Sequence, residues 1–294
     1  MHSKILYNGN MLDKASFALP PDNRAFRYGD GVFESMRVVG GKVLWPEKHF
    51  DRLRVSAKLL KMQLPAGWSA GFLQDCAAAL YEANHPNDPA ARFRLALFRS
   101  GGGLYAPLCN KASYLIESEA LGQAGFSLNT RGAHIGLFAD LCKPVNAFSP
   151  LKTINAQLYV MAGIYKRENG LGDCLLLNNI GHVVEASASN IFVAGKGKII
   201  TPPLSEGCVD GVMRSVIIEM AAKYGLDLSE EALPPVLLEE AEEVFLTNAV
   251  QGIRWVGSYG NKRYYNGLSR KLNGLLNEMA DTSTGSLGLP AAGN

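Results

Sequence analysis

Short stretches of alternating apolar and polar residues, interleaved with helical patterns, fill residues 1–117. The expected strands cover residues 32–39, 42–45, 92–99 and 112–117. Gly40 and Gly41 join the first two strands, because glycine reaches the positive φ of a tight hairpin turn without steric cost. Apolar residues at helical spacing predict helices over residues 47–61 and 70–83. This part of the chain is therefore expected to be a mixed unit of helices and strands.

A second unit of the same kind follows it. Strands are expected at residues 173–177, 191–194, 198–201 and 244–247, and helices after Lys152 and over 212–224 and 268–280. The sequence thus predicts an α+β protein with a smaller N-terminal α/β domain over residues 1–117, a linker over 118–125 and a larger domain over 126–280. Residues 281–294 lack bulky apolar periodicity, and we expect a disordered tail there.

Composition narrows the class of protein. The 294 residues carry a formal net charge of +2 and no basic stripe, so we expect no nucleic-acid partner. The five cysteines form no CxxC pair and the five histidines have no ligand spacing, which argues against a disulfide framework and a metal site. No apolar run reaches the roughly 18 residues of a membrane span. Because no signal-peptide pattern opens the chain either, we expect a cytoplasmic protein with no membrane contact.

Six local patterns occur along the chain in a fixed order. They are YGDGVFESMR (Tyr28–Arg37), HFDRL (His49–Leu53), SPLKTIN (Ser149–Asn155), EASASNIF (Glu185–Phe192), TPP followed by DGVMR (Thr201–Arg214), and FLTNA (Phe245–Ala249). Together they resemble the class IV aminotransferases, or fold-type IV pyridoxal phosphate (PLP) enzymes. This family includes branched-chain and D-amino-acid aminotransferases and 4-amino-4-deoxychorismate lyase. The resemblance implies two α/β domains of the D-amino-acid aminotransferase type, PLP at their interface, and a homodimer.

The resemblance assigns the residues that hold PLP. Lys152 is the lysine that forms the Schiff base and moves protons, a role that needs an amine with a lowered pKa. Lys143, nine residues earlier, is the competing lysine but lacks the family context. Glu185 matches the carboxylate that keeps the ring nitrogen protonated, and Arg52 matches the phosphate arginine. Ala188 is expected to be small because the ring packs against it. Taken singly, each could be a surface residue, and only the ordered set favours a site.

The phosphate is expected at the start of a second helix. The backbone amides of Val212 and Met213 lie in the first turn after Gly211, where free N–H groups and the helix dipole favour an anion. The family usually has threonine where this chain has Met213, so a hydroxyl contact is lost. Asp210 would repel phosphate, and we expect it to point away as an N-cap. Asn248 falls in the turn that reaches the phosphate.

Four residues are assigned to the substrate by the same resemblance. Tyr28 and Phe33 match the strand that lines the family's pocket, and Ala249 falls in the turn near the substrate carboxylate. Arg94 stands where branched-chain enzymes place an arginine near that carboxylate, although an outward residue of a half-exposed strand would fit as well. The roles of Arg37, Arg254 and the glycine triplet at Gly101 stay open, although the triplet lies near where a loop from the neighbouring subunit would close the pocket.

Departures from the family leave the substrate open. Branched-chain enzymes carry a tyrosine five residues after the lysine for the ring hydroxyl, where this chain has Gln157, and a glycine where it has Ser35. The leading hypothesis is an aminotransferase that moves an amino group between an amino acid, branched-chain among the candidates, and a 2-oxo acid. One alternative is 4-amino-4-deoxychorismate lyase, which eliminates pyruvate to give 4-aminobenzoate. The other is a non-catalytic PLP-binding paralogue.

Overall fold

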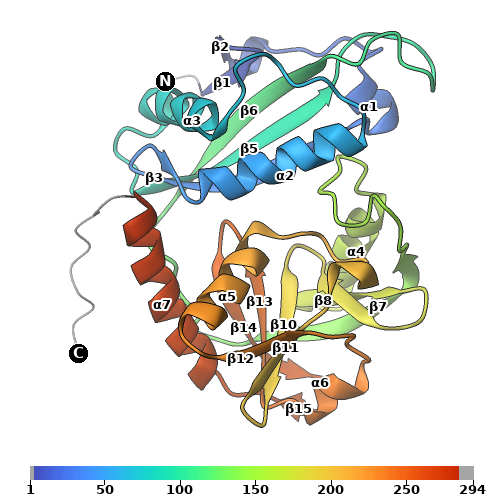
Figure 1. Cartoon of the computed structure of the whole chain (residues 1–294), viewed down its shortest axis with the longest axis vertical. Coiled ribbons are helices and arrows are strands. Elements are labelled where there is room, and N and C mark those ends of the chain that lie inside the picture. The colour runs from blue at the N-terminus through green and yellow to red at the C-terminus, as the bar shows by residue number, and fades with distance from the viewer. Residues whose placement is uncertain (1–2, 285–294) are drawn as a thin grey trace.

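The computed structural model describes residues 3–284, which form two lobes that face each other (Figure 1). The N-terminal lobe is built on a six-stranded sheet in the order β2-β1-β6-β5-β3-β4, in which all neighbours are antiparallel. Its strands are β1 (Lys4–Tyr7), β2 (Asn10–Asp13), β3 (Gly31–Val39), β4 (Lys42–Val43), β5 (Ala90–Arg99) and β6 (Ala112–Leu121). Its helices are the 3-10 helix η1 (Lys14–Ser16), α1 (Arg24–Tyr28), α2 (Pro46–Leu59) and α3 (Ala70–Asn84).

The alternation of β3 explains how this lobe presents a functional face. Val32 and Met36 are buried in a core that the sheet forms with α2 and α3. Because successive side chains of a strand point to opposite faces, Phe33 and Ser35 point away from that core. Pairing with β5 over the whole length of β3 fixes this register. One face of the sheet therefore packs against helices, and the other is available to a site.

The C-terminal lobe contains a mixed nine-stranded sheet in the order β12-β11-β10-β13-β14-β7-β8-β9, with β15 paired to β14. Its strands are β7 (Ala133–Lys143), β8 (Asp173–Asn178), β9 (Val183–Ala186), β10 (Asn190–Gly195), β11 (Lys198–Thr201), β12 (Asp227–Glu230), β13 (Glu243–Asn248), β14 (Gly252–Tyr259) and β15 (Lys262–Arg263). Its helices are α4 (Gln157–Glu168), η2 (Leu204–Glu206), α5 (Val212–Lys223), α6 (Val236–Glu240) and α7 (Gly267–Thr284).

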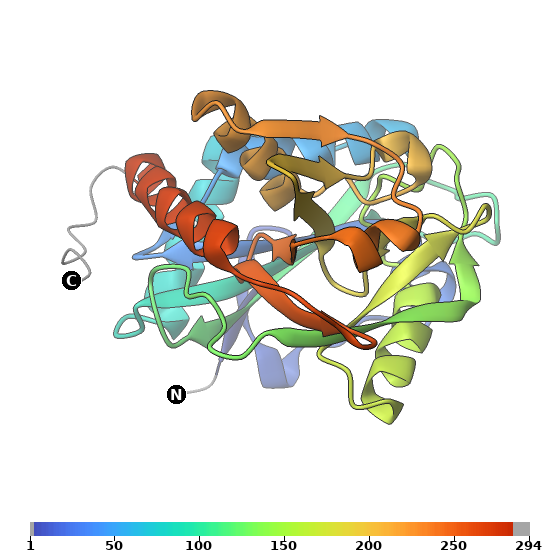
Figure 2. The ribbon, with the colours of Figure 1, turned by 90° about the horizontal axis from the view of Figure 1, so that it is seen from below.

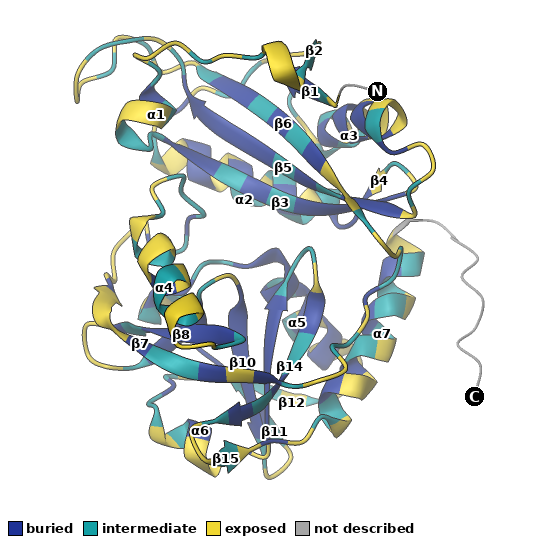
Figure 3. Ribbon diagram, turned by 180° about the vertical axis from the view of Figure 1, so that it is seen from behind, coloured by how far each residue is buried: buried dark blue, intermediate teal, exposed yellow. Residues whose placement is uncertain are grey.

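Helices α5 and α7 complete the main core of this lobe. They pack against the stacked rings of Phe192 and Phe245, whose centroids lie 5.0 Å apart. Figure 2 shows α7 lying across the outside of the lobe, beside β14. The strands of both sheets are mostly buried, whereas α4 and α7 keep exposed faces (Figure 3). No helix within residues 3–284 is long and apolar enough to cross a membrane.

Most elements expected from the sequence are present, and three of the boundaries that differ have a clear structural cause. The strand expected over 42–45 ends at Val43, because Trp45 adopts a left-handed conformation with φ 51° and begins α2. Strand β6 continues to Leu121, inside the expected linker, because it stays paired with β5 up to Ala90. Helix α7 continues to Thr284, four residues into the expected tail, and the predicted disorder after it lies outside the described residues.

Candidate active site

A cavity of about 460 Å³ lies between the two lobes, and both contribute residues to its lining. A cavity of this size suits a cofactor-sized ligand. The residues assigned from the sequence that line it are Phe33, Arg52, Lys152, Glu185, Ala188, Val212, Met213, Asn248 and Ala249. These residues come from β3, α2, the segment before α4, β9 and the turn after it, α5, and the turn after β13. The structure therefore brings most of the candidate residues to one place.

Lys152 is positioned by its own backbone. The Lys152 carbonyl accepts a hydrogen bond from the Phe33 amide at 2.8 Å, and the Ile154 amide donates to Gly31 at 2.9 Å, so this segment extends the edge of β3. The Lys152 Nζ lies 4.4 Å from the centre of the Phe33 ring. Burial of the amine, reinforced by the positive charge of Arg52, lowers the pKa of Lys152 to about 8. Roughly a tenth of the amine is therefore neutral and nucleophilic at pH 7, far more than for an ordinary lysine.

Glu185 lies at the floor of the cavity and is buried. Its Oε1 accepts hydrogen bonds from Tyr159 Oη at 2.6 Å and from the ammonium of Lys143. Its Oε2 accepts the Val209 amide at 2.8 Å. These three donors satisfy the buried carboxylate oxygens and fix the direction of the group. The carboxylate is thus a preformed partner for a cationic or N–H group of a ligand.

Arg52 projects from α2 and is held by a buried acid. Its Nε donates to Glu34 Oε1 at 2.7 Å, and His49 Nδ1 lies 2.6 Å from Glu34 Oε2. A further bond, 2.8 Å from Nη1 to the carbonyl of Asp210, joins Arg52 to the other lobe. Burial opposes ionisation of Glu34, but Arg52 and His49 outweigh burial and lower the pKa of Glu34 to about 2. The guanidinium is therefore fixed at the edge of the cavity.

The start of α5 forms the opposite wall. Gly211 occupies the N-cap and provides no side-chain cap, so the first amides of the helix have no cap partner there. Asp210 is therefore not the N-cap, contrary to the expectation, and its carbonyl instead meets Arg52. A Cβ on Gly211 would lie 1.9 Å from Asn190 Oδ1, so only glycine fits. Thr247 Oγ1 is buried in the lining and has no hydrogen-bond partner among the described residues.

Several sequence candidates lie outside the cavity lining. Tyr28 packs against Tyr105, with ring centres 5.6 Å apart. Arg94 lies over the Phe33 ring at 4.6 Å and 3.7 Å from Glu117, so it packs against a lining residue without lining the cavity itself. Arg254 faces Asp173, with Nη1 3.3 Å from Oδ2, away from the lining.

Arg37 has a structural arrangement that sequence reasoning left open. Its guanidinium donates to the carbonyls of Gln123, Ala124 and Gly125 in the linker and to Val250 in the cavity turn. Burial lowers the pKa of Arg37 to about 10. Arg37 thus ties the linker between the lobes to the turn that lines the cavity.

The structure adds lining residues that the sequence analysis did not select, among them Ser35, Arg92, Tyr159, Thr247 and Gln251. Ser35 and Arg92 follow from strand alternation, since each is two positions from a candidate on the same strand. Tyr159 stands seven residues after Lys152, whereas Gln157, at the position of the family's tyrosine, is exposed and outside the lining. Thr247 carries no signal in sequence beyond its place in FLTNA.

Comparisons with known proteins agree with this geometry. A family model described as amino-transferase class IV matches residues 31–259. The chain therefore belongs to the class IV aminotransferases, a family of PLP-dependent enzymes. The match includes the cavity residues of both lobes, from Phe33 to Ala249.

Relatives in this family differ in activity. A protein of Methanocaldococcus jannaschii assigned as a branched-chain-amino-acid aminotransferase is 30% identical over 257 residues, which cover 85% of each chain. The aminodeoxychorismate lyase of Bacillus subtilis is 28% identical, and the match covers 84% of this chain and 83% of that protein. The solved PLP form of the branched-chain amino acid aminotransferase of Thermobaculum terrenum has a TM-score of 0.82 at 19% identity, covering 96% of this chain and 95% of that one. The predicted fold and enzyme class are confirmed, and the aminotransferase is favoured over the lyase.

Proposed function

We propose that this chain binds PLP in the cavity between its lobes and transfers an amino group between an amino acid and a 2-oxo acid. The observation that carries the proposal is the Lys152 amine, desolvated in a cavity that also presents a fixed carboxylate and a fixed guanidinium. When bound, PLP supplies an electron sink that stabilises negative charge on the substrate carbon. Glu185 and Arg52 are fixed before any ligand arrives, which is the preorganisation that binding and catalysis require.

The donor set fits PLP group by group. Lys152 is the amine for its aldehyde, and Glu185 is the carboxylate that can hold a proton on its ring nitrogen. Arg52 and the first amides of α5 can bind the phosphate, and the unpartnered Thr247 hydroxyl is a further donor. Ala188 leaves room for a planar ring against the backbone. Once the lysine is displaced, its Nζ can take a proton from the substrate Cα and deliver it elsewhere.

The substrate that we propose is an amino acid with an apolar side chain, branched-chain amino acids among them. Phe33, Leu151 and Val250 give the lining apolar surface for such a side chain. Arg92 is a cation of the lining on β5, and its guanidinium pairs with exposed Glu119 at 3.2 Å. A substrate carboxylate can therefore compete for Arg92 at little cost, because an exposed ion pair is worth about 1 kcal/mol or less.

Absorbance of the protein reconstituted with PLP tests this function. Leucine, valine, isoleucine, glutamate and D-alanine are added singly, and the proposal expects at least one to convert bound PLP to its amino form. A 2-oxo acid should then reverse the change. Lys152→Ala should bind PLP without the change, and Gln157→Ala, which alters an exposed residue of the same segment, should behave as wild type. Release of 4-aminobenzoate from aminodeoxychorismate without an amino acceptor, or PLP binding without any reaction, would contradict the aminotransferase.

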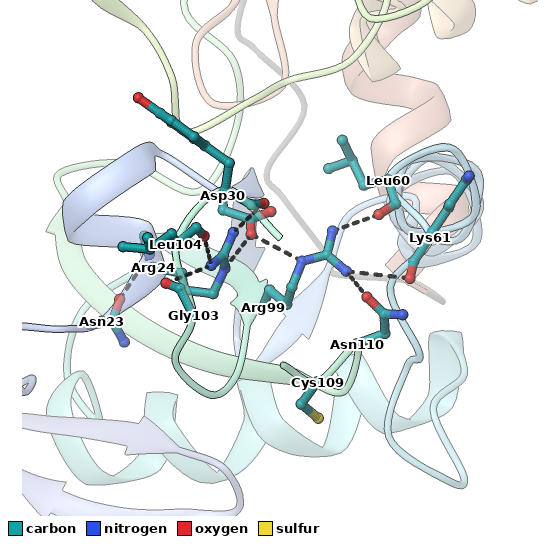
Figure 4. Close-up of polar contacts among 12 residues, drawn as sticks. Asn23, Arg24, Asp30, Leu60, Lys61, Arg99, Gly103, Leu104, Cys109 and Asn110 are labelled. Atoms are coloured by element: carbon teal, nitrogen blue, oxygen red, sulfur yellow. Dashed lines mark hydrogen bonds and ion pairs between the residues drawn. The ribbon is translucent and has the colours of Figure 1, made fainter. Parts of the chain in front are cut away.

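We also propose that the active form is a homodimer located in the cytoplasm. Residues 100–110 form a loop that exposes Leu104, Tyr105 and Leu108, which are 75%, 91% and 83% exposed. Figure 4 shows how buried Arg24 holds this loop, through 3.2 and 2.6 Å bonds to the carbonyls of Gly103 and Leu104. An apolar tip on a fixed loop suits contact with another protein surface.

Buried ion pairs hold the exposed loop in one position, as a contact with a second copy of the chain would require. Arg24 and Arg99 both donate to Asp30 Oδ2, at 2.7 and 2.9 Å, so the loop is anchored to the start of β3 (Figure 4). Light scattering on the wild type should give twice the chain mass, and Tyr105→Asp should shift the protein toward the monomer. A wild-type monomer at micromolar concentration would contradict the homodimer without affecting the proposed reaction.

A further inference from the structure

The carboxylate of Glu185 already accepts hydrogen bonds from three groups of the protein, in addition to any bond that it would form to the ring nitrogen of PLP. Lys143 Nζ and Tyr159 Oη both donate to Oε1, and the Val209 amide donates to Oε2. The side chains of Lys143 and Glu185 are 6% and 4% exposed. The two side chains depend on each other, because an unpaired charge buried this deeply would be strongly destabilising. Glu185 is therefore already neutralised in part by a fixed cation within the protein.

Lys143 reaches Glu185 from outside the cavity lining. It is the last residue of β7, and its ammonium lies 5.5 Å from the centre of the Tyr159 ring. The lining of the cavity includes Glu185 and Tyr159 but not Lys143. A ligand that binds Glu185 therefore meets the carboxylate from one side while Lys143 stays bonded on the other. A positively charged group of the ligand would therefore be the second cation to contact the Glu185 carboxylate, after Lys143.

Tyr159 adds a second donor, and this donor keeps its proton. Burial, together with the charge of Glu185, raises the pKa of Tyr159, so the phenol stays protonated and donates to Oε1. Its place on α4 is specific, because Gln157, two residues earlier, is exposed and lies outside the cavity lining. Lys152, from the cavity side, and buried Cys208 also interact electrostatically with the Glu185 carboxylate.

We propose that Lys143 and Tyr159 are positioning residues that fix the Glu185 carboxylate and offset part of its charge, so that the ring nitrogen of PLP holds its proton less tightly than beside a lone carboxylate. The inference rests on the PLP-binding function proposed above. It assigns to Lys143 a role that is neither the Schiff-base lysine nor a substrate contact. The strength of PLP as an electron sink is then set by a residue that does not touch it.

The test is the protonation of the ring nitrogen in the holoenzyme, measured by NMR with PLP labelled with 15N at that atom. Lys143→Met removes the competing cation and should raise the pH at which the nitrogen loses its proton by on the order of 1 to 2 units. Tyr159→Phe removes a neutral donor and should produce a smaller rise, of up to about 1 unit. Lys143→Arg keeps the charge and should titrate as wild type, as should Gln157→Ala.

Three outcomes separate this inference from the proposed function. A wild-type protein that takes up no PLP removes both. PLP uptake with a ring nitrogen that stays protonated up to pH 10 in the wild type, or with a Lys143→Met titration that overlays the wild type, removes the inference alone. Where Lys143→Met fails to fold, Tyr159→Phe decides, because that change leaves the buried ion pair intact and an unchanged titration contradicts the role of the network.

Discussion

The buried acid behind Arg52 yields a sharp prediction about stability. Glu34 is 1% exposed, accepts hydrogen bonds from Arg52, and lies 2.6 Å from His49 Nδ1. Glu34→Gln keeps the size of the side chain but removes the charge that Arg52 and His49 face. The guanidinium is then left nearly buried, with the Asp210 carbonyl as its remaining strong acceptor. Breaking a buried pair in this way costs about 3–5 kcal/mol of unfolding free energy.

The pH dependence of that loss follows from the sign of the pKa shift. The pKa of Glu34 is lowered from 4.5 to about 2, so the folded state gains stability above pH 4.5 and loses it as the pH falls toward 2. At 1.36 kcal/mol for each pKa unit, the shift contributes about 3 kcal/mol at pH 7. By linkage, about 2 kcal/mol of this is lost by pH 3. The wild type should therefore lose more than half of this contribution to its advantage over Glu34→Gln by pH 3.

Urea unfolding at pH 7, 5, 4 and 3 measures both effects. We expect the free-energy difference between wild type and Glu34→Gln to be largest at pH 7 and to shrink steadily below pH 4.5. Glu219→Gln is the matched control, because Glu219 pairs with Lys48 at the surface and its loss should change stability by less than about 1 kcal/mol at any pH. A difference that stays constant from pH 7 to pH 3 would show that the charge of Glu34 does not hold this arrangement.

Three further predictions follow from the cavity. In the PLP-free protein, amine-selective labelling of Lys152 read by peptide mass spectrometry should have its midpoint near pH 8, and a midpoint at the ordinary lysine value of about 10.4 would contradict its desolvation. Arg37→Met should lower the free energy of unfolding by roughly 2–4 kcal/mol and increase hydrogen exchange of residues 122–126, with unchanged exchange as the contrary result. Gly211→Ala should lower stability by roughly 1–3 kcal/mol and weaken PLP binding measured by fluorescence titration, because its Cβ collides with Asn190; wild-type affinity would contradict the collision.

Sequence periodicity predicted the elements whose buried positions recur regularly along the chain. Strand β5 and helix α3 match their expected ranges closely, because each buries one face against a single core. Strand β7 was missed, since its buried and exposed positions do not alternate and its pairing with β8 shifts register between Phe138 and Lys143. Helix α1 was missed because its five residues are too few for periodicity, and the Asn23 cap and left-handed Gly29 define it instead.

In the candidate site too, local sequence patterns identified some residues, and the packing of distant elements determines the others. Ordered motifs selected Lys152, Glu185 and Arg52, which the structure brings to one cavity, although their roles there remain proposals. The sequence analysis selected Arg94 for the substrate, whereas Arg92, two positions earlier on the same face of β5, is the arginine that lines the cavity. Strand alternation alone does not distinguish the two positions, because the packing of the lobes decides which one reaches the lining. The contacts around Glu185 depend on how β7 and α4 meet β9, which no local pattern records.

The ion pairs of Arg52 also bear on how the protein folds while it is being synthesised. Its partners within the N-terminal lobe are Glu34 and His49, and the last strand of that lobe ends at Leu121. Domains fold as units during translation, the N-terminal one first. The lobe can therefore fold with its buried guanidinium already paired while residue 210 is still unmade. The guanidinium of Arg52 would then already be oriented when the C-terminal lobe folds against it and completes the cavity.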